Sequence, residues 1–283
     1  MSAQDTEFYQ KTERIFKQDS PAIVMGILNV TSDSFYDGGQ YNSEEGWLAQ
    51  TKKMIDDGAG IIDIGAYSTR PGAKNISEEE ETSQLIKAIS SVRKHFPEVL
   101  ISADTFRALV AEKAVEAGAN IINDISGGTM DAKMFETVAK LQVPYILMHM
   151  QGTPENMQKN PVYKNVTEEV FAFFASKINE LNSLGFDKII LDPGFGFGKT
   201  FEHNISLLQN LESFQALKFP LLVGLSRKSF IRKILSGDHD DHLSGSISAA
   251  ILSILKGAKI VRVHDVKETQ SAIKIMQIAQ GEI

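Results

Sequence analysis

The chain of 283 residues contains no cysteine. This absence excludes disulfide bonds, thiolate metal ligands and a cysteine nucleophile together. Long hydrophobic runs are also missing, since no stretch reaches the ~18 consecutive apolar residues that a membrane-spanning helix needs. The first twenty residues are polar and charged and lack the apolar core of a signal peptide. We therefore expect a cytoplasmic protein that does not contact a membrane.

Positive charge is scarce relative to negative charge. The 29 lysines and arginines are outnumbered by 36 aspartates and glutamates, which gives a formal net charge of −7. This balance argues against sequence-independent binding of nucleic acid, although a local basic pocket is compatible with it. The length permits two average domains or one large α/β domain.

Short apolar segments rich in β-branched residues recur along the chain. Eight are predicted as strands, at residues 23–30, 61–65, 99–104, 120–124, 143–149, 188–192, 221–224 and 260–264. Segments with helical periodicity lie between them, including residues 44–57, 78–95, 107–117, 167–184 and 267–280. Apolar strands that alternate with helices are typical of a parallel sheet covered by helices. Eight repeats predict a single-domain (β/α)₈ TIM barrel over residues 21–283, after an extension at residues 1–20; a doubly wound sheet is the alternative.

Polar side chains stand at or just after the ends of the predicted strands. They are Asn29, Asp63, Asp104, Asn123, His149, Asp192, Arg262 and His264. In a barrel these ends meet at one face, which is where active sites lie. Asp and Asn are also favoured helix N-caps. Helix capping explains any single one of these residues better than it explains the whole set.

The stretch DPGFGFGKT (residues 192–200) ends like a nucleotide-binding loop. A P-loop would need glycine five positions before Gly198, where the chain has Pro193, and a dinucleotide fingerprint would need glycine in place of Lys199. The glycines instead allow a sharp turn that brings the backbone near a flat ligand. Phe195 or Phe197 then lies against that ligand or packs beneath the loop, and Lys199 has no predicted role.

Seven stretches occur in a fixed order along the chain. They are GILNVTSDSFYDGG (26–39), DIGAYSTRPGA (63–73), SADT (102–105), NDISGG (123–128), LDPGFGFGK (191–199), GLSRKS (224–229) and RVHDV (262–266). Together they resemble the dihydropteroate synthases, a family of pterin-binding TIM barrels, from about residue 22 to the C-terminus. The resemblance implies a transferase of folate biosynthesis. It would join p-aminobenzoate to 6-hydroxymethyl-7,8-dihydropterin pyrophosphate, forming 7,8-dihydropteroate and pyrophosphate.

The resemblance also implies a pterin subsite. Its residues would be Asp104, Asn123, Met148, Asp192, Phe197, Lys228 and Arg262. A buried carboxylate can accept two hydrogen bonds from the guanidine-like edge of a pterin. The Lys228 ammonium would donate to the carbonyl side and Arg262 would stack on the ring. Met148 is equally well explained by core packing.

The other two subsites follow from the same resemblance. The pyrophosphate would contact Asn29, Arg70, Arg262 and His264, with Mg²⁺ held between Asn29 and the phosphates. The p-aminobenzoate would contact Phe35, Thr69, Arg70, Pro71 and Ser229, and Ser229 would hold its carboxylate at a helix N-terminus.

A dissociative displacement is the expected mechanism, since the amine of p-aminobenzoate is itself the nucleophile. Asp37, Asp104 and Asp192 would stabilise a methylene cation on the pterin, and Lys228 completes the predicted catalytic set. The alternatives are a corrinoid methyltransferase that uses methyltetrahydrofolate and a pterin-binding barrel without activity.

Two positions depart from the usual family pattern. Ser32 replaces a proline, and Tyr67 of the stretch Gly65-Ala66-Tyr67 replaces a glutamate. Loop closure and sulfonamide affinity are the properties that these changes would affect. The apolar stretch at residues 246–255 fits either core burial or the interface of a homodimer.

Overall fold

The computed structural model describes residues 3–17, 19–30, 43–68, 75–235 and 242–281. Within these residues, eight parallel strands close into a barrel in sequence order. The strands are β1 (Ile23–Asn29), β2 (Ile61–Gly65), β3 (Leu100–Asp104), β4 (Ile121–Asp124), β5 (Tyr145–Met148), β6 (Ile189–Asp192), β7 (Leu221–Val223) and β8 (Ala258–Val263). Pairing of β8 with β1, in which Ile260 lies opposite Ile23, closes the barrel. The TIM-barrel prediction is therefore confirmed, and the doubly wound sheet is excluded.

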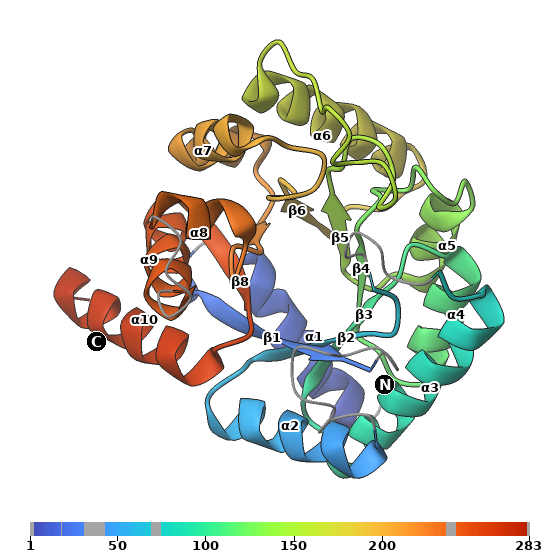
Figure 1. The fold of residues 1–283 in the computed structure, drawn as a ribbon. Helices are drawn as coiled ribbons and strands as arrows, with labels where there is room; N and C mark the ends of the chain where they lie inside the picture. The colour runs from blue at the N-terminus through green and yellow to red at the C-terminus, as the bar shows by residue number, and fades with distance from the viewer. Residues whose placement is uncertain (1–2, 18, 31–42, 69–74, 236–241, 282–283) are drawn as a thin grey trace.

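Helices form a ring around the strands (Figure 1). The described helices are α1 (Ala3–Phe16), α2 (Glu44–Asp56), α3 (Glu78–His95), α4 (Ala108–Glu116), α5 (Met134–Leu141), α6 (Val166–Ser183), α7 (Phe201–Gln209), the 3₁₀ helix η2 (Leu211–Leu217), α8 (Ser229–Ile234), α9 (His242–Leu255) and α10 (Val266–Gln280). Side-chain caps define several starts, such as the Ser77–Glu80 capping box of α3. None of the described helices is long and apolar enough to cross a bilayer.

An apolar layer fills the barrel near the N-terminal ends of the strands. Each strand contributes one residue to it: Met25, Ile61, Leu100, Ile121, Ile146, Ile190, Leu222 and Ile260. Side chains alternate along a strand, so the residue two positions later again points into the barrel. On five strands that next residue is polar, namely Asp63, Ser102, Asn123, Asp192 and Arg262. A polar layer therefore lies directly above the apolar one, toward the C-terminal ends of the strands.

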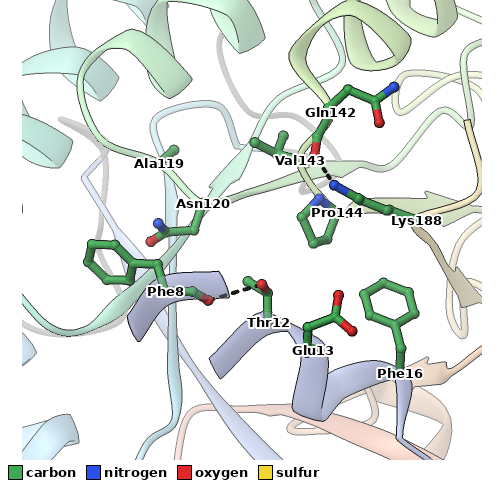
Figure 2. A pocket seen from close by; sticks show the side chains of 10 residues that line it. All are labelled: Phe8, Thr12, Glu13, Phe16, Ala119, Asn120, Gln142, Val143, Pro144 and Lys188. Carbon is green, nitrogen blue, oxygen red and sulfur yellow. Dashed lines mark hydrogen bonds between the residues drawn. The ribbon is translucent and has the colours of Figure 1, made fainter. Parts of the chain in front are cut away.

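Helix α1, which comes from the predicted N-terminal extension, covers the N-terminal end of the barrel. Ile15 is only 1% exposed and packs into the apolar layer together with Phe8 and Phe16. Figure 2 shows α1 facing the segments that lead into β4, β5 and β6, across a small pocket lined by Phe8, Phe16 and Lys188 among others. The Arg93 guanidinium lies 4.4 Å from the centre of the Phe8 ring. These contacts make α1 part of the barrel core.

Truncating Ile15 should lower the stability of the protein without affecting its chemistry. Ile15→Ala leaves a cavity against the apolar layer, and such substitutions cost about 2–5 kcal/mol of unfolding free energy. Denaturant titration measures this loss. Val162→Ala, at a side chain that is 64% exposed, should cost less than about 0.5 kcal/mol. A comparable loss from both variants would mean that α1 does not pack as described.

Candidate active site

Asp63 is the centre of the polar layer. Its side chain is fully buried, and it accepts hydrogen bonds from Ser102 Oγ at 2.6 Å and Arg262 Nε at 2.6 Å. The Asn123 amide also donates to both of its carboxylate oxygens, at 3.3 and 3.2 Å. Asp63 thereby fixes two of the predicted pterin residues, Asn123 and Arg262. The sequence pattern predicts no role for it beyond its place near a strand end.

Arg262 bridges two carboxylates. Its Nε donates to Asp63, and its second terminal nitrogen donates to Asp104 Oδ2 at 3.0 Å. Burial and the neighbouring Asp63 carboxylate raise the pKa of Asp104 to about 7, while Arg262 opposes this rise. The guanidinium edge is occupied by protein groups, and its side chain is 23% exposed. Arg262 is therefore held in one orientation at the mouth of the barrel.

Asp192 and Lys228 form the other side of the cluster. Asp192 ends β6, and its Oδ1 accepts a hydrogen bond from the Gly194 amide at 2.8 Å. Burial raises the pKa of Asp192, whereas the Gly194 amide and Lys228 act against that rise. Burial, followed by repulsion from Arg262, lowers the pKa of Lys228 to about 8. A buried carboxylate and a half-buried ammonium thus lie at the same end of the barrel.

An apolar cluster borders these polar groups. It contains Phe106, Ile125, Met148, Met150 and Met157, with Tyr67 and Phe197 packed against them. The Lys228 ammonium lies 4.4 Å from the centre of the Phe197 ring. Phe195, in contrast, is 1% exposed and stacks on Phe230. Phe197 is therefore the aromatic residue of the loop that lies near the polar cluster, and Phe195 is a packing residue.

All three glycines of the β6–α7 loop (residues 193–200) have positive φ, at 69° for Gly194, 81° for Gly196 and 59° for Gly198. A Cβ atom would lie 2.0 Å from the His149 carbonyl oxygen at Gly194, and 2.4 Å from that of Gln151 at Gly198. The amides of Gly194 and Gly196 donate to Asp192 and Asn204. The loop is therefore tied to the exit of β5, and these amides do not form a phosphate cradle.

Gly194→Ala should disrupt this loop. Left-handed backbone costs about 1–2 kcal/mol for a residue with a Cβ atom, and the overlap with His149 adds about 1–3 kcal/mol. Gly185→Ala is a matched control, since Gly185 has φ 74° but no atom within 4 Å of the added Cβ. It should show the backbone cost alone. Thermal unfolding and pterin titration of both variants check this difference, and equal behaviour would contradict the close approach.

The remaining predicted residues that the structure describes are His264, Asn29 and Ser229. The His264 Nδ1 is hydrogen-bonded to Ser226 Oγ at 3.0 Å, and burial lowers the pKa of His264 to about 3. His264 is therefore neutral near pH 7 and can contact a phosphate as a hydrogen-bonding group. Asn29 ends β1 and is half-buried, and Ser229 is exposed at the first position of α8. Phe35, Asp37, Thr69, Arg70 and Pro71 lie outside the described residues.

Tyr67 has partners of its own. Its ring packs edge-on against Phe106 at 5.1 Å, and its hydroxyl donates to Asn75. The Arg107 guanidinium lies 5.6 Å from the ring centre and pairs with the fully buried Glu81. Tyr67 therefore anchors the start of the β2–α3 connection through apolar and cation–π contacts.

Comparison with known proteins identifies relatives over nearly the whole chain. A family model described as "Pterin binding enzyme" matches residues 25–264. Dihydropteroate synthase of Haemophilus influenzae is 45% identical over 256 residues, covering 90% of this chain and 92% of the relative. The Escherichia coli K12 enzyme is also 45% identical and covers 90% of each.

Solved structures agree with these relatives. Yersinia pestis dihydropteroate synthase in complex with a sulfonamide drug superposes with a TM-score of 0.87 at 41% identity, covering 93% of this chain and 95% of the other. The Xanthomonas albilineans dihydropteroate synthase in complex with 7,8-dihydropteroate has a TM-score of 0.83 at 35% identity, with the same coverage.

Proposed function

The chain belongs to the dihydropteroate synthases of the pterin-binding enzyme family, and we propose that it performs their reaction by dissociative displacement at the strand-end cluster. The reaction condenses p-aminobenzoate with 6-hydroxymethyl-7,8-dihydropterin pyrophosphate in folate biosynthesis. One observation carries the assignment to this site: Asp104, Asn123, Asp192 and Lys228 converge at the C-terminal end of one barrel. Neither the methyltransferase nor the inactive barrel is represented among the relatives described above, which are named dihydropteroate synthases.

The pterin ring would bind between the polar cluster and the apolar wall. Asp192 is the residue best suited to accept the ring's N–H edge, because its second oxygen has no protein donor in the described residues. Lys228, which interacts electrostatically with Asp192, would donate to the pterin carbonyl, and Asn123 is held by Asp63. Met148 and Phe197 would contact the ring from the apolar side. This arrangement supports a flat ligand with donors and acceptors on its rim.

The displacement would begin with breakage of the bond between the pterin methylene carbon and the pyrophosphate oxygen. The bonding electrons leave with the pyrophosphate, and the methylene cation is conjugated with the electron-rich pterin. Asp104 and Asp192 lie at the cluster where they can stabilise that charge electrostatically. The amine nitrogen of p-aminobenzoate then bonds to the methylene carbon and releases a proton. Asp37, outside the described residues, is part of the same proposal.

Exchange of oxygen isotopes tests the dissociative step. Substrate labelled with ¹⁸O at the bridging oxygen is incubated with enzyme and Mg²⁺ but without p-aminobenzoate. Reversible cleavage lets the pyrophosphate rotate, so the label should reach the non-bridging positions of the recovered substrate. Recovery of the label solely in the bridging position, under conditions where the enzyme is fully active, would favour a concerted displacement.

Magnesium fits the residues at the end of β1. The Asn29 side chain is half-buried there, and its amide oxygen is a hard ligand of the kind that Mg²⁺ accepts. Within the described ranges, no three His, Asp or Glu residues are grouped to hold a metal ion. With Asn29 as the protein ligand, the site suits a Mg²⁺ ion whose other ligands are mainly water and substrate phosphate. When bound, Mg²⁺ would neutralise charge on the departing pyrophosphate.

Ser229→Ala should separate the two substrate subsites. Ser229 is exposed beside Lys228, and we propose that it contacts the carboxylate of p-aminobenzoate together with Thr69 and Arg70. Removing one hydrogen bond to a charged group costs about 1.5–3 kcal/mol, so the KM for p-aminobenzoate should rise about ten- to hundredfold. The affinity for pterin should stay unchanged. Equal losses for both substrates in steady-state kinetics would show that the subsites are assigned wrongly.

A homodimer in the cytoplasm completes the proposal. Helices α9 and α10 expose Leu252, Leu255, Ile275 and Ile278, which are 42–70% exposed. These two helices pack against each other, so their exposed residues offer an apolar surface to a second copy. Sedimentation should give a dimer for the wild type and a monomer for Leu252→Glu/Leu255→Glu. A monomeric wild type would contradict this assembly, and cell fractionation tests the location.

A further inference from the structure

Lys199 ends the β6–α7 loop with its side chain enclosed by protein. It is 3% exposed. Its ammonium lies 3.0 Å from the Gly194 carbonyl oxygen, 3.0 Å from that of Phe197 and 3.2 Å from that of His149. His149 Nδ1 is a fourth acceptor at 3.0 Å. One side chain thus joins the loop after β6 to the residue that follows β5.

These partners are all neutral groups, which is unusual for a buried cation. Burial lowers the pKa of Lys199 to about 7, and the Asp192 carboxylate opposes this decrease. Burial and Lys199 also lower the pKa of His149 to about 2, so the imidazole is neutral and accepts at Nδ1. An ammonium has three protons to donate, and hydrogen bonds from a charged donor are stronger than neutral ones. The loop carbonyls are therefore held more firmly than by turns alone.

The two loop residues that Lys199 holds are connected to the pterin cluster. Gly194, bound through its carbonyl, donates its amide to Asp192 Oδ1 at 2.8 Å. Phe197, bound the same way, places its ring 4.4 Å from the Lys228 ammonium. The loop is also tied from outside this centre, since Gln158 donates to the Gly196 carbonyl and Tyr163 to the Gly198 carbonyl. Lys199 differs from Gln158 and Tyr163 because its acceptors include Gly194, whose amide binds Asp192, and Phe197, whose ring contacts Lys228.

We propose that Lys199 is a positioning residue for the pterin subsite. It holds Gly194 and Phe197 against the exit of β5, and through them it orients the Asp192 carboxylate and the aromatic wall. The proposal rests on the function assigned above. It predicts that loss of the ammonium weakens pterin binding while leaving p-aminobenzoate binding intact, because the acceptors of Lys199 lie on the β5 and β6 segments and Ser229 lies on α8.

Lys199→Met removes the charge and keeps most of the side-chain length. Lys188→Met is the matched control. Lys188 directly precedes β6, at the end of the barrel opposite to Lys199, and its ammonium donates to the Gln142 carbonyl. Titration calorimetry with 6-hydroxymethylpterin measures affinity, and steady-state kinetics give both KM values. Removing a buried, charged hydrogen-bond donor leaves its acceptors unpaired, so we expect the Kd for pterin to rise about ten- to hundredfold. The KM for p-aminobenzoate should change less than about threefold.

Hydrogen exchange provides a second readout on the same proteins. Amides of residues 194–198 should exchange faster in Lys199→Met, while those of α3 and α4 stay protected. Wild-type pterin affinity in Lys199→Met, or equal losses for both substrates, would overturn the proposal. If Lys199→Met does not fold, the same comparison of pterin and p-aminobenzoate binding is made with Lys199→Gln. Normal pterin binding by Lys199→Gln would also overturn the proposal. Wild-type protein that binds pterin but forms no product would instead contradict the proposed function.

Discussion

Replacing Asp192 by asparagine should nearly abolish pterin binding and leave the fold intact. The amide has the shape of the carboxylate, so it can still accept the Gly194 hydrogen bond. It cannot accept two hydrogen bonds from the pterin edge, and it leaves Lys228 without its nearest opposite charge on β6. Losing one partner of a buried charged pair costs about 2–5 kcal/mol of binding free energy. That range corresponds to a rise in Kd of about thirty- to several thousandfold.

The control for Asp192→Asn is Asp187→Asn, at an exposed residue that precedes the same strand. Calorimetric titration with pterin should show normal affinity for the control. Thermal unfolding should show that both variants are folded. Near-normal pterin affinity in Asp192→Asn would remove this carboxylate from the pterin subsite.

Replacing Arg262 by methionine should damage both stability and activity. Asp63 is fully buried and would lose its charged partner, and breaking a buried ion pair costs about 3–5 kcal/mol of unfolding free energy. Asp104 would lose its hydrogen bond as well. Because we propose that the guanidinium also contacts the pyrophosphate, kcat/KM should fall at least about a hundredfold. Denaturant unfolding and steady-state kinetics measure the two effects separately.

A double variant separates the structural role of Arg262 from its chemical role. Asp63→Asn combined with Arg262→Met removes both charges of the buried pair, and the asparagine introduced by Asp63→Asn can still accept the hydrogen bond from Ser102. Stability should recover by at least about 1 kcal/mol relative to Arg262→Met alone, as expected for coupled neighbours. Activity should not recover. Recovery of activity in the double variant would show that Arg262 acts only on the fold.

Much of the architecture was predictable because it depends on local sequence. Parallel strands of a barrel end at one face, so the strand-end positions of Asp104 and Asp192 already placed them together. The same reasoning grouped Asp63 of β2 (Ile61–Gly65) with the strand-end residues but did not predict that it orients its neighbours. Its importance comes from Ser102 on β3 and Arg262 on β8, and both residues are far from it in sequence. The inward alternation of side chains was the signal that would have found it.

The contacts of Lys199 and α1 could not be predicted for a different reason. Lys199 binds carbonyl groups whose directions depend on the left-handed glycines of the folded loop. Helix α1 has few apolar residues, and Ile15 is buried only because the apolar layer of the barrel lies above it. Both are tertiary effects, which intrinsic propensity does not encode. The stretch DPGFGFGKT thus resembles a phosphate loop in its letters, yet its lysine faces the protein interior.

The most direct test is a product assay with purified protein. Dihydropteroate and pyrophosphate are quantified together in reactions that contain, or omit, p-aminobenzoate, pterin pyrophosphate and Mg²⁺. Both products should form in equal amounts when all three components are present, and both should be lost in Asp192→Asn. Sustained pyrophosphate release that does not depend on p-aminobenzoate, or dihydropteroate formation at wild-type rates by Asp192→Asn, would contradict it.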